Sequence, residues 1–213
     1  MKEIREVLQN KVGKITIYKE WKACANQNQG IGQFINADHQ PPVSSILAAR
    51  KSNQNSKLPQ AMHEVATNAS PLNTNLISDM GKYHGLNLPI VYVPAKVHCE
   101  FPSTKSPNLL NSLATAISRG DVVGTFKLTI LGAMPRFMLC STFQNNQQSK
   151  TRLQSFKNSF QQHSKMMVQE WFKPLQAKGV METDNLTTLI AWINTKGYNN
   201  QNDPYRNQFS TRL

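Results

Sequence analysis

The strongest constraint on the fold is a strict alternation of side chains over residues 89–101, PIVYVPAKVHCEF. Successive side chains of a strand point to opposite faces, so this period of two predicts a β-strand. One face collects small and apolar residues, and the other is more mixed. The two sets are Val91, Val93, Ala95, Val97, Cys99 and Phe101, and Ile90, Tyr92, Pro94, Lys96, His98 and Glu100. Pro94 has no N–H to give to a ladder, which predicts an edge strand or a bulge.

The next segments predict a helix and a β-hairpin. Ser106 followed by Pro107 is typical of a helix start, and Gly120 of a helix end, so a helix is expected from 106 to 119. Residues 123–131 alternate again, and 136–143 are apolar on both sides. These two segments, joined by a short connection, predict a hairpin.

Apolar residues at helical spacing predict two further helices, over 150–177 and 184–195. The order β-α-β-β-α indicates an α+β fold, with a small antiparallel sheet in a ferredoxin-like (split βαβ) core and flanking helices. The segment 14–19, KITIYK, could add one more strand to that sheet.

The remaining sequence divides the chain into three expected parts. Residues 1–87 form a helical and loop-rich N-terminal region, 88–196 the α+β core with its C-terminal helices, and 197–213 a disordered tail. Within the first part we expect helices at 2–12, 43–51, 58–66 and 75–84 and a loop over 24–44. Because this part has few large apolar residues and many helix breakers, it is expected to be loosely packed or ordered by a partner.

The chain is strongly basic, with 24 Lys and Arg against 12 Asp and Glu and a net charge of +12. Solubility of a small domain needs a net charge of only about 2 to 8. A larger surplus attracts polyanions, among which nucleic acid is the commonest, although an anionic membrane surface or an acidic protein would also fit. The sequence also has 21 Asn and 17 Gln, which suit base edges and phosphates but also follow from AT-rich codon usage.

Three groups of residues are the candidates for nucleic-acid contact. The first lies near the N-terminus, the second on the polar face of the expected sheet, and the third on the expected long helix. They are Lys11, Lys14, Lys19 and Lys22; Tyr92, Lys96 and Lys127; and Lys150, Arg152, Lys157 and Lys165. A solvated helix face and an ordinary exposed sheet face remain the alternatives, although a solvated helix normally mixes charges of both signs.

Signals for catalysis and cofactors are weak. The 12 acids are scattered, the five histidines have no ligand spacing, and no glycine-rich phosphate-binding motif occurs, so no cofactor or metal is expected. His98, beside Lys96 or Tyr92, remains a remote candidate for the base of a metal-independent RNase. Three distant cysteines without a CxxC pair, and no long apolar stretch, predict a cytoplasmic protein without membrane insertion.

Together these patterns predict a non-catalytic protein that binds DNA or RNA. It would be a subunit of a nucleoprotein complex, and its basic, amide-rich composition would suit a bacterial mobile element or a virus. The alternative is an adaptor or assembly protein whose basic surface docks an acidic protein partner.

Overall fold

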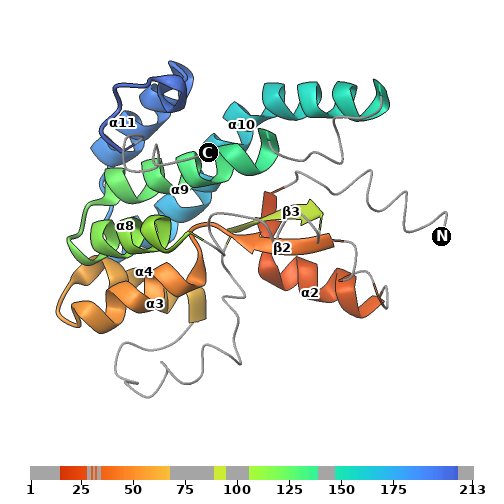
Figure 1. Cartoon of the computed structure of the whole chain (residues 1–213). Helices are drawn as coiled ribbons and strands as arrows, with labels where there is room; N and C mark the ends of the chain where they lie inside the picture. Colours follow the sequence, from red (N-terminus) through yellow and green to blue (C-terminus); the bar gives the residue numbers. More distant parts are fainter. Residues whose placement is uncertain are drawn as a thin grey trace.

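The computed structural model describes residues 15–27, 30, 32, 35–67, 89–94, 106–138 and 147–205. Within these ranges the backbone alone is described for 15–19, 35, 67, 89, 91–94, 134–138 and 147–159. The described part is mostly helical, with one small sheet beside the helices (Figure 1).

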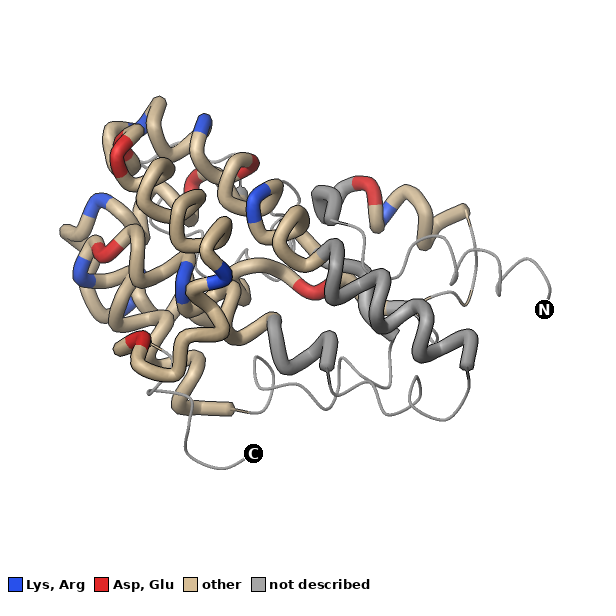
Figure 2. The backbone as a smooth tube through the Cα atoms, turned by 90° about the horizontal axis from the view of Figure 1, so that it is seen from above, with Lys and Arg blue, Asp and Glu red and all other residues tan. Residues whose placement is uncertain are grey.

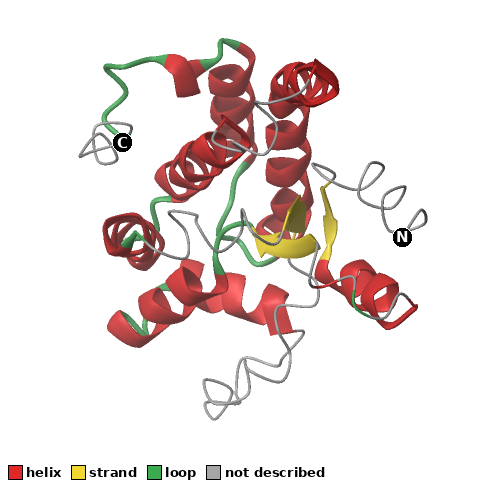
Figure 3. Cartoon of the chain, turned by 45° about the vertical axis from the view of Figure 1, so that its right-hand side comes forward, coloured by secondary structure: helices red, strands yellow, loops and turns green. Residues whose placement is uncertain are grey.

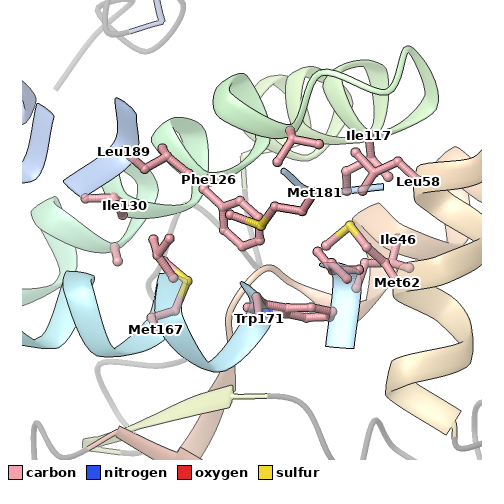
Figure 4. Close-up of a cluster of buried hydrophobic side chains, with 14 of the residues drawn as sticks. Ile46, Leu58, Met62, Ile117, Phe126, Ile130, Met167, Trp171, Met181 and Leu189 are labelled. Atoms are coloured by element: carbon pink, nitrogen blue, oxygen red, sulfur yellow. The ribbon is translucent and has the colours of Figure 1, made fainter. Parts of the chain in front are cut away.

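Six helices and a 3₁₀ turn make up the main body. Their bounds are α3 Val43–Ser52, α4 Lys57–Thr67, α8 Pro107–Ser118, α9 Val122–Met138, α10 Gln147–Ala177, α11 Thr183–Asn194 and η3 Gly197–Asn199. All seven elements supply buried side chains to one hydrophobic core (Figure 4). Trp171 of α10 is fully buried in this core, with its ring centroid 6.2 Å from that of Phe126 of α9. Burial of such large rings is the main favourable term that holds these helices together.

The sheet has three antiparallel strands, β1 Ile15–Ile17, β2 Ile35–His39 and β3 Pro89–Pro94, in the order β1-β3-β2 (Figure 3). Helix α2, Tyr18–Gln27, follows β1 directly, and α10 contacts both β1 and β3. A second link runs through Trp171, whose Nε1 donates a hydrogen bond to the backbone oxygen of Gln40 at 2.8 Å. The sheet is therefore fastened to the helical core through α10.

The predicted ferredoxin-like α+β core is wrong. The segments 123–131 and 136–143 were expected to form a hairpin, but residues 122–138 form the helix α9, and 139–143 lie outside the described residues. The alternation in this segment does not separate a solvent-exposed face from a buried one. Thr125 and Thr129 are buried, as are Phe126, Leu128 and Ile130. The threonine hydroxyls donate to carbonyls four residues earlier, Asp121 at 2.7 Å and Thr125 at 2.8 Å. A helix buried on nearly every side thus satisfies its polar groups internally and loses the 3.6-residue pattern.

The predicted strand at 89–101 exists over residues 89–94, and 95–101 lie outside the described residues. The edge position inferred from Pro94 is wrong, because β3 is the central strand. Its two prolines, Pro89 and Pro94, are its first and last residues, so neither interrupts the middle of the ladder. The segment 14–19 supplies a strand, since β1 pairs with β3 from Ile15 opposite Val91.

The N-terminal part is better packed than expected. Ile46 and Ala49 of α3 and Met62 of α4 are fully buried in the main core, so the prediction of a loosely packed region is wrong for residues 43–67. The loop expected over 24–44 is also wrong in part, since α2 extends to Gln27 and β2 covers 35–39. The helices expected at 2–12 and 75–84 lie outside the described residues.

The other helix predictions are confirmed. Helices α3, α4, α8, α10 and α11 lie where the apolar spacing placed them. Ser106 caps α8 by accepting a hydrogen bond from the backbone N–H of Leu109 at 3.4 Å, and Gly120 follows with a positive φ of 73°.

The C-terminal segment was expected to be a disordered tail, but residues 197–205 pack on the core. Tyr198 of η3 is 6% exposed, with its ring edge-on to that of Phe160 at 5.2 Å. Asp203 is buried as well. Residues 206–213 lie outside the described part.

Candidate nucleic-acid interface

An acid-free basic segment of the described chain lies on α10. Its residues 147–169 contain no Asp or Glu and carry Lys150, Arg152, Lys157 and Lys165, of which Lys165 is half-buried. Positions 150 and 157 precede the buried Ser164 by fourteen and seven residues, which is close to four and two helical turns. These two positions therefore lie in phase on the helix. In Figure 1 the N-terminal half of α10 extends beyond the helices of the core.

The N-terminal candidates that the structure describes belong to α2. Lys19 and Lys22 lie on this helix, and Lys22 is exposed. Helix α2 follows β1, which contacts α10, so the two helices are linked through this strand. Lys11 and Lys14 lie outside the described residues.

The second group, the polar face of the expected sheet, does not exist as predicted. Tyr92 lies on β3, but Lys127 lies on α9, so the two do not share a sheet. Lys127 is only 16% exposed, and its Nζ lies 3.3 Å from Oδ2 of the buried Asp203. Lys96 and His98 lie outside the described residues.

Two aromatic rings complete the surroundings of Lys127. Its Nζ lies 5.1 Å from the ring centroid of Trp192 and 5.5 Å from that of Tyr205, within the range of cation–π contacts. Oδ2 of Asp203 also accepts a hydrogen bond from Nε1 of Trp192 at 2.9 Å. The charge of Lys127 is therefore neutralised inside the protein. It holds the C-terminal segment on α9 and is not available to a phosphate.

The structure also groups basic residues that the sequence patterns did not single out. Lys51 in the last turn of α3, Lys57 in the first turn of α4, and Arg119 at the end of α8 are all exposed. The α3–α4 connection is joined to α8 by a hydrogen bond from Nδ2 of Asn53 to the backbone oxygen of Ser118, at 3.1 Å. We call Lys51, Lys57 and Arg119 the α3–α8 patch. The available sequence signal was the absence of any acid between Asp38 and Glu64.

A partly buried polar network lies on α4, the helix that carries Lys57. Oε2 of Glu64 is 2.6 Å from Nζ of Lys178, and its Oε1 accepts a hydrogen bond from Gln60 at 3.0 Å. Burial by itself raises the pKa of Glu64, but the hydrogen bonds from Lys178 and Gln60 outweigh it, so this pKa lies below its ordinary value. Burial lowers the pKa of His63, and the nearby charge of Arg50 lowers it further. The network keeps Glu64 ionised and His63 neutral at pH 7.

Other kinds of site find no support in the described part of the chain. Its His, Cys, Asp and Glu side chains do not gather in any group of three that could hold a metal ion. None of the helices described here is long and apolar enough to cross a membrane. Figure 2 shows the described Lys and Arg positions spread over several helices, with acidic positions among them.

No protein-family model, curated protein or solved structure matches the chain.

Proposed function

We propose that this protein binds nucleic acid without catalysing a reaction, and that α10 is its main phosphate contact. The observation that carries the proposal is that the acid-free basic segment 147–169 lies on one continuous helix. A row of cations without acids creates a positive field along the helix, and a polyanion with regularly spaced phosphates matches it.

The neighbouring elements support the same assignment. Lys19 and Lys22 add positive charge on α2, which is linked to α10 through β1. Such contacts position the nucleic acid through its backbone and do not read its sequence. The proposed role is that of a cytoplasmic subunit of a nucleoprotein complex.

Fluorescence anisotropy with labelled oligonucleotides of mixed sequence tests this proposal. Binding of duplex DNA should weaken steeply as salt rises from about 50 to 200 mM, since each phosphate contact contributes about −0.9 to the logarithmic slope. Single-stranded DNA and RNA of equal length, measured in parallel, identify the preferred nucleic acid. Absence of binding to all three at low salt would refute the proposal.

A pair of double variants tests the location. Lys150→Gln/Lys157→Gln should lower the magnitude of the duplex slope by about 1.8, because two counterion-releasing contacts are lost. Lys173→Gln/Lys196→Asn removes the same charge from two exposed positions outside the acid-free segment 147–169 and serves as the control. Equal slopes in the two variants would show that the segment 147–169 of α10 is not the contact. Stoichiometric capture of an acidic protein by a chain that binds no nucleic acid would favour the adaptor alternative.

A further inference from the structure

A second positive surface lies on the α3–α8 patch, at the other end of the described part from the first turns of α10 (Figure 1). It comprises Lys51, Lys57 and Arg119, which project from three different helices. The hydrogen bond between Asn53 and Ser118 holds the α3–α4 connection against the end of α8. The patch is thus built by the tertiary fold and does not come from one run of sequence.

The acids near this patch are engaged elsewhere. Asp121, two residues after Arg119, accepts hydrogen bonds from the backbone N–H of Gly124 at 2.8 Å and from the hydroxyl of Tyr205 at 2.7 Å. Glu64 is held by Lys178 and Gln60. The described structure gives Lys51, Lys57 and Arg119 no ion pair. The three positive charges are therefore not neutralised within the protein.

Helix dipoles explain only part of this arrangement. A cation near a helix C-terminus is stabilised by the dipole, which accounts for Lys51 on α3 and Arg119 on α8 taken singly. Lys57 is the opposite case, because it lies in the first turn of α4, where the dipole disfavours a cation and where no acid is present. The helix N-terminus and Lys57 together form a positive centre that an anion would stabilise.

The loop between the two lysines supplies neutral partners for a phosphate chain. Residues 52–56 read SNQNS, and all but Ser56 are exposed. Hydroxyl and amide groups of this kind commonly accompany Lys and Arg in contacts to phosphate and sugar.

We infer that the α3–α8 patch is a second phosphate-contact surface for the nucleic acid, separate from α10. This inference rests on the proposed function and adds to it, because a protein with two such surfaces engages the polyanion at two ends.

The test compares Lys51→Gln/Lys57→Gln with the control Lys173→Gln/Lys196→Asn in the same anisotropy assay. All four positions are exposed, so each variant should keep the circular-dichroism spectrum of the parent chain. The patch variant should lower the magnitude of the duplex salt slope by about 1.8 and bind on the order of tenfold more weakly near 150 mM salt. Adding Arg119→Gln should lower the slope by about another 0.9.

The outcomes separate this inference from the proposed function. If the parent chain binds and the patch variant behaves as the control does, the patch is not a contact, and the proposed contact through α10 is unaffected. If Lys150→Gln/Lys157→Gln leaves binding intact and the patch variant weakens it, the patch is a contact and the proposed contact through α10 is refuted. A parent chain that binds no nucleic acid overturns both. Lys51→Arg/Lys57→Arg keeps the charges and should bind as the parent chain does, whereas weakened binding would argue against a phosphate contact.

Discussion

At the scale of single residues, the surroundings of a charged group decide whether it can meet a ligand. Lys127 and Lys57 look alike in the sequence, since each is a lysine followed by a leucine. In the structure Lys127 is enclosed by Trp192, Tyr205 and Asp203, whereas Lys57 is exposed and has no ion pair. Sequence spacing alone does not distinguish them, because the acid that neutralises Lys127 lies 76 residues further along the chain.

The buried His63 gives the first prediction, a loss of stability in mild acid. Its pKa lies below 6.5 because burial disfavours the charged ring and Arg50 repels it, while Glu64 acts more weakly in the opposite direction. The unfolded chain therefore takes up the proton first as the pH falls below 6.5, which favours unfolding. Burial lowers the pKa of His163 in the same direction. Each histidine contributes at most about 1.4 kcal/mol per pH unit.

Urea unfolding between pH 7.5 and 5 measures this effect. The free energy of unfolding should fall with pH in the parent chain, less in His63→Gln, and least in His63→Gln/His163→Gln. Glu64 does not confuse the result, because its pKa lies below 4.5 and its ion pair with Lys178 is lost only at lower pH. An unchanged pH slope in the double variant would contradict the assignment.

At the scale of elements, the sequence predicted the helices that have one buried face and one solvent-exposed face. Helix α10 shows this well, since the apolar residues Phe160, Met167, Trp171 and Leu175 recur at helical spacing and all are buried. Helix α9 was not predicted because it is buried almost all round, and its alternating threonines give the period of two that is typical of a strand. Strand β2 was not predicted for another reason. Its sequence INADH has no apolar alternation, and only its pairing with β3 makes it a strand.

The candidate site was predictable to a similar degree. The basic run on α10 was visible because it lies in one continuous segment of the sequence. The α3–α8 patch was not, because three separate helices contribute to it and the Asn53–Ser118 contact joins residues 65 positions apart. Only the tertiary fold brings such residues together.

The C-terminal segment gives the second prediction, at the scale of an element. Asp203 accepts hydrogen bonds from Trp192 and from the backbone of Tyr205, and it pairs with Lys127. The segment also lies so close to α9 that a Cβ on Gly124 would come within 2.7 Å of the Tyr205 ring. Asp203→Asn should lower the free energy of unfolding by about 1.5 to 3 kcal/mol, because a partly buried charged hydrogen bond is lost.

Chemical denaturation of Asp203→Asn measures that loss, and Asp184→Asn at an exposed position of α11 is the matched control. The control should change stability by less than about 1 kcal/mol, because Asp184 lies in the first turn of α11 and loses only its interaction with the helix dipole. Equal stability of the two variants would show that the segment does not depend on Asp203.

At the scale of the whole molecule, α10 connects the parts. Its C-terminal half lies in the helical core, it contacts β1 and β3, and it carries the basic segment proposed for phosphate contact. A polar link between the core and the end of β2 is the hydrogen bond from Trp171 to the backbone oxygen of Gln40. Packing and this hydrogen bond together should make the described sheet and helices unfold as one unit.

Trp171→Phe tests that coupling and is the third prediction. Phenylalanine keeps most of the buried ring but has no N–H, so the Gln40 oxygen loses its buried donor, at a cost of about 1 to 3 kcal/mol. In the parent chain, far-ultraviolet circular dichroism, dominated by the helices, and the fluorescence of Trp21, which is buried in α2 next to the sheet, should report one urea midpoint. In Trp171→Phe the fluorescence midpoint should fall further than the circular-dichroism midpoint. Both chains also carry Trp192→Phe. The parent then fluoresces from Trp21 and Trp171, and the variant from Trp21 alone. Two midpoints that fall together would show that the contacts of α10 with β1 and β3 hold the sheet in place without this hydrogen bond.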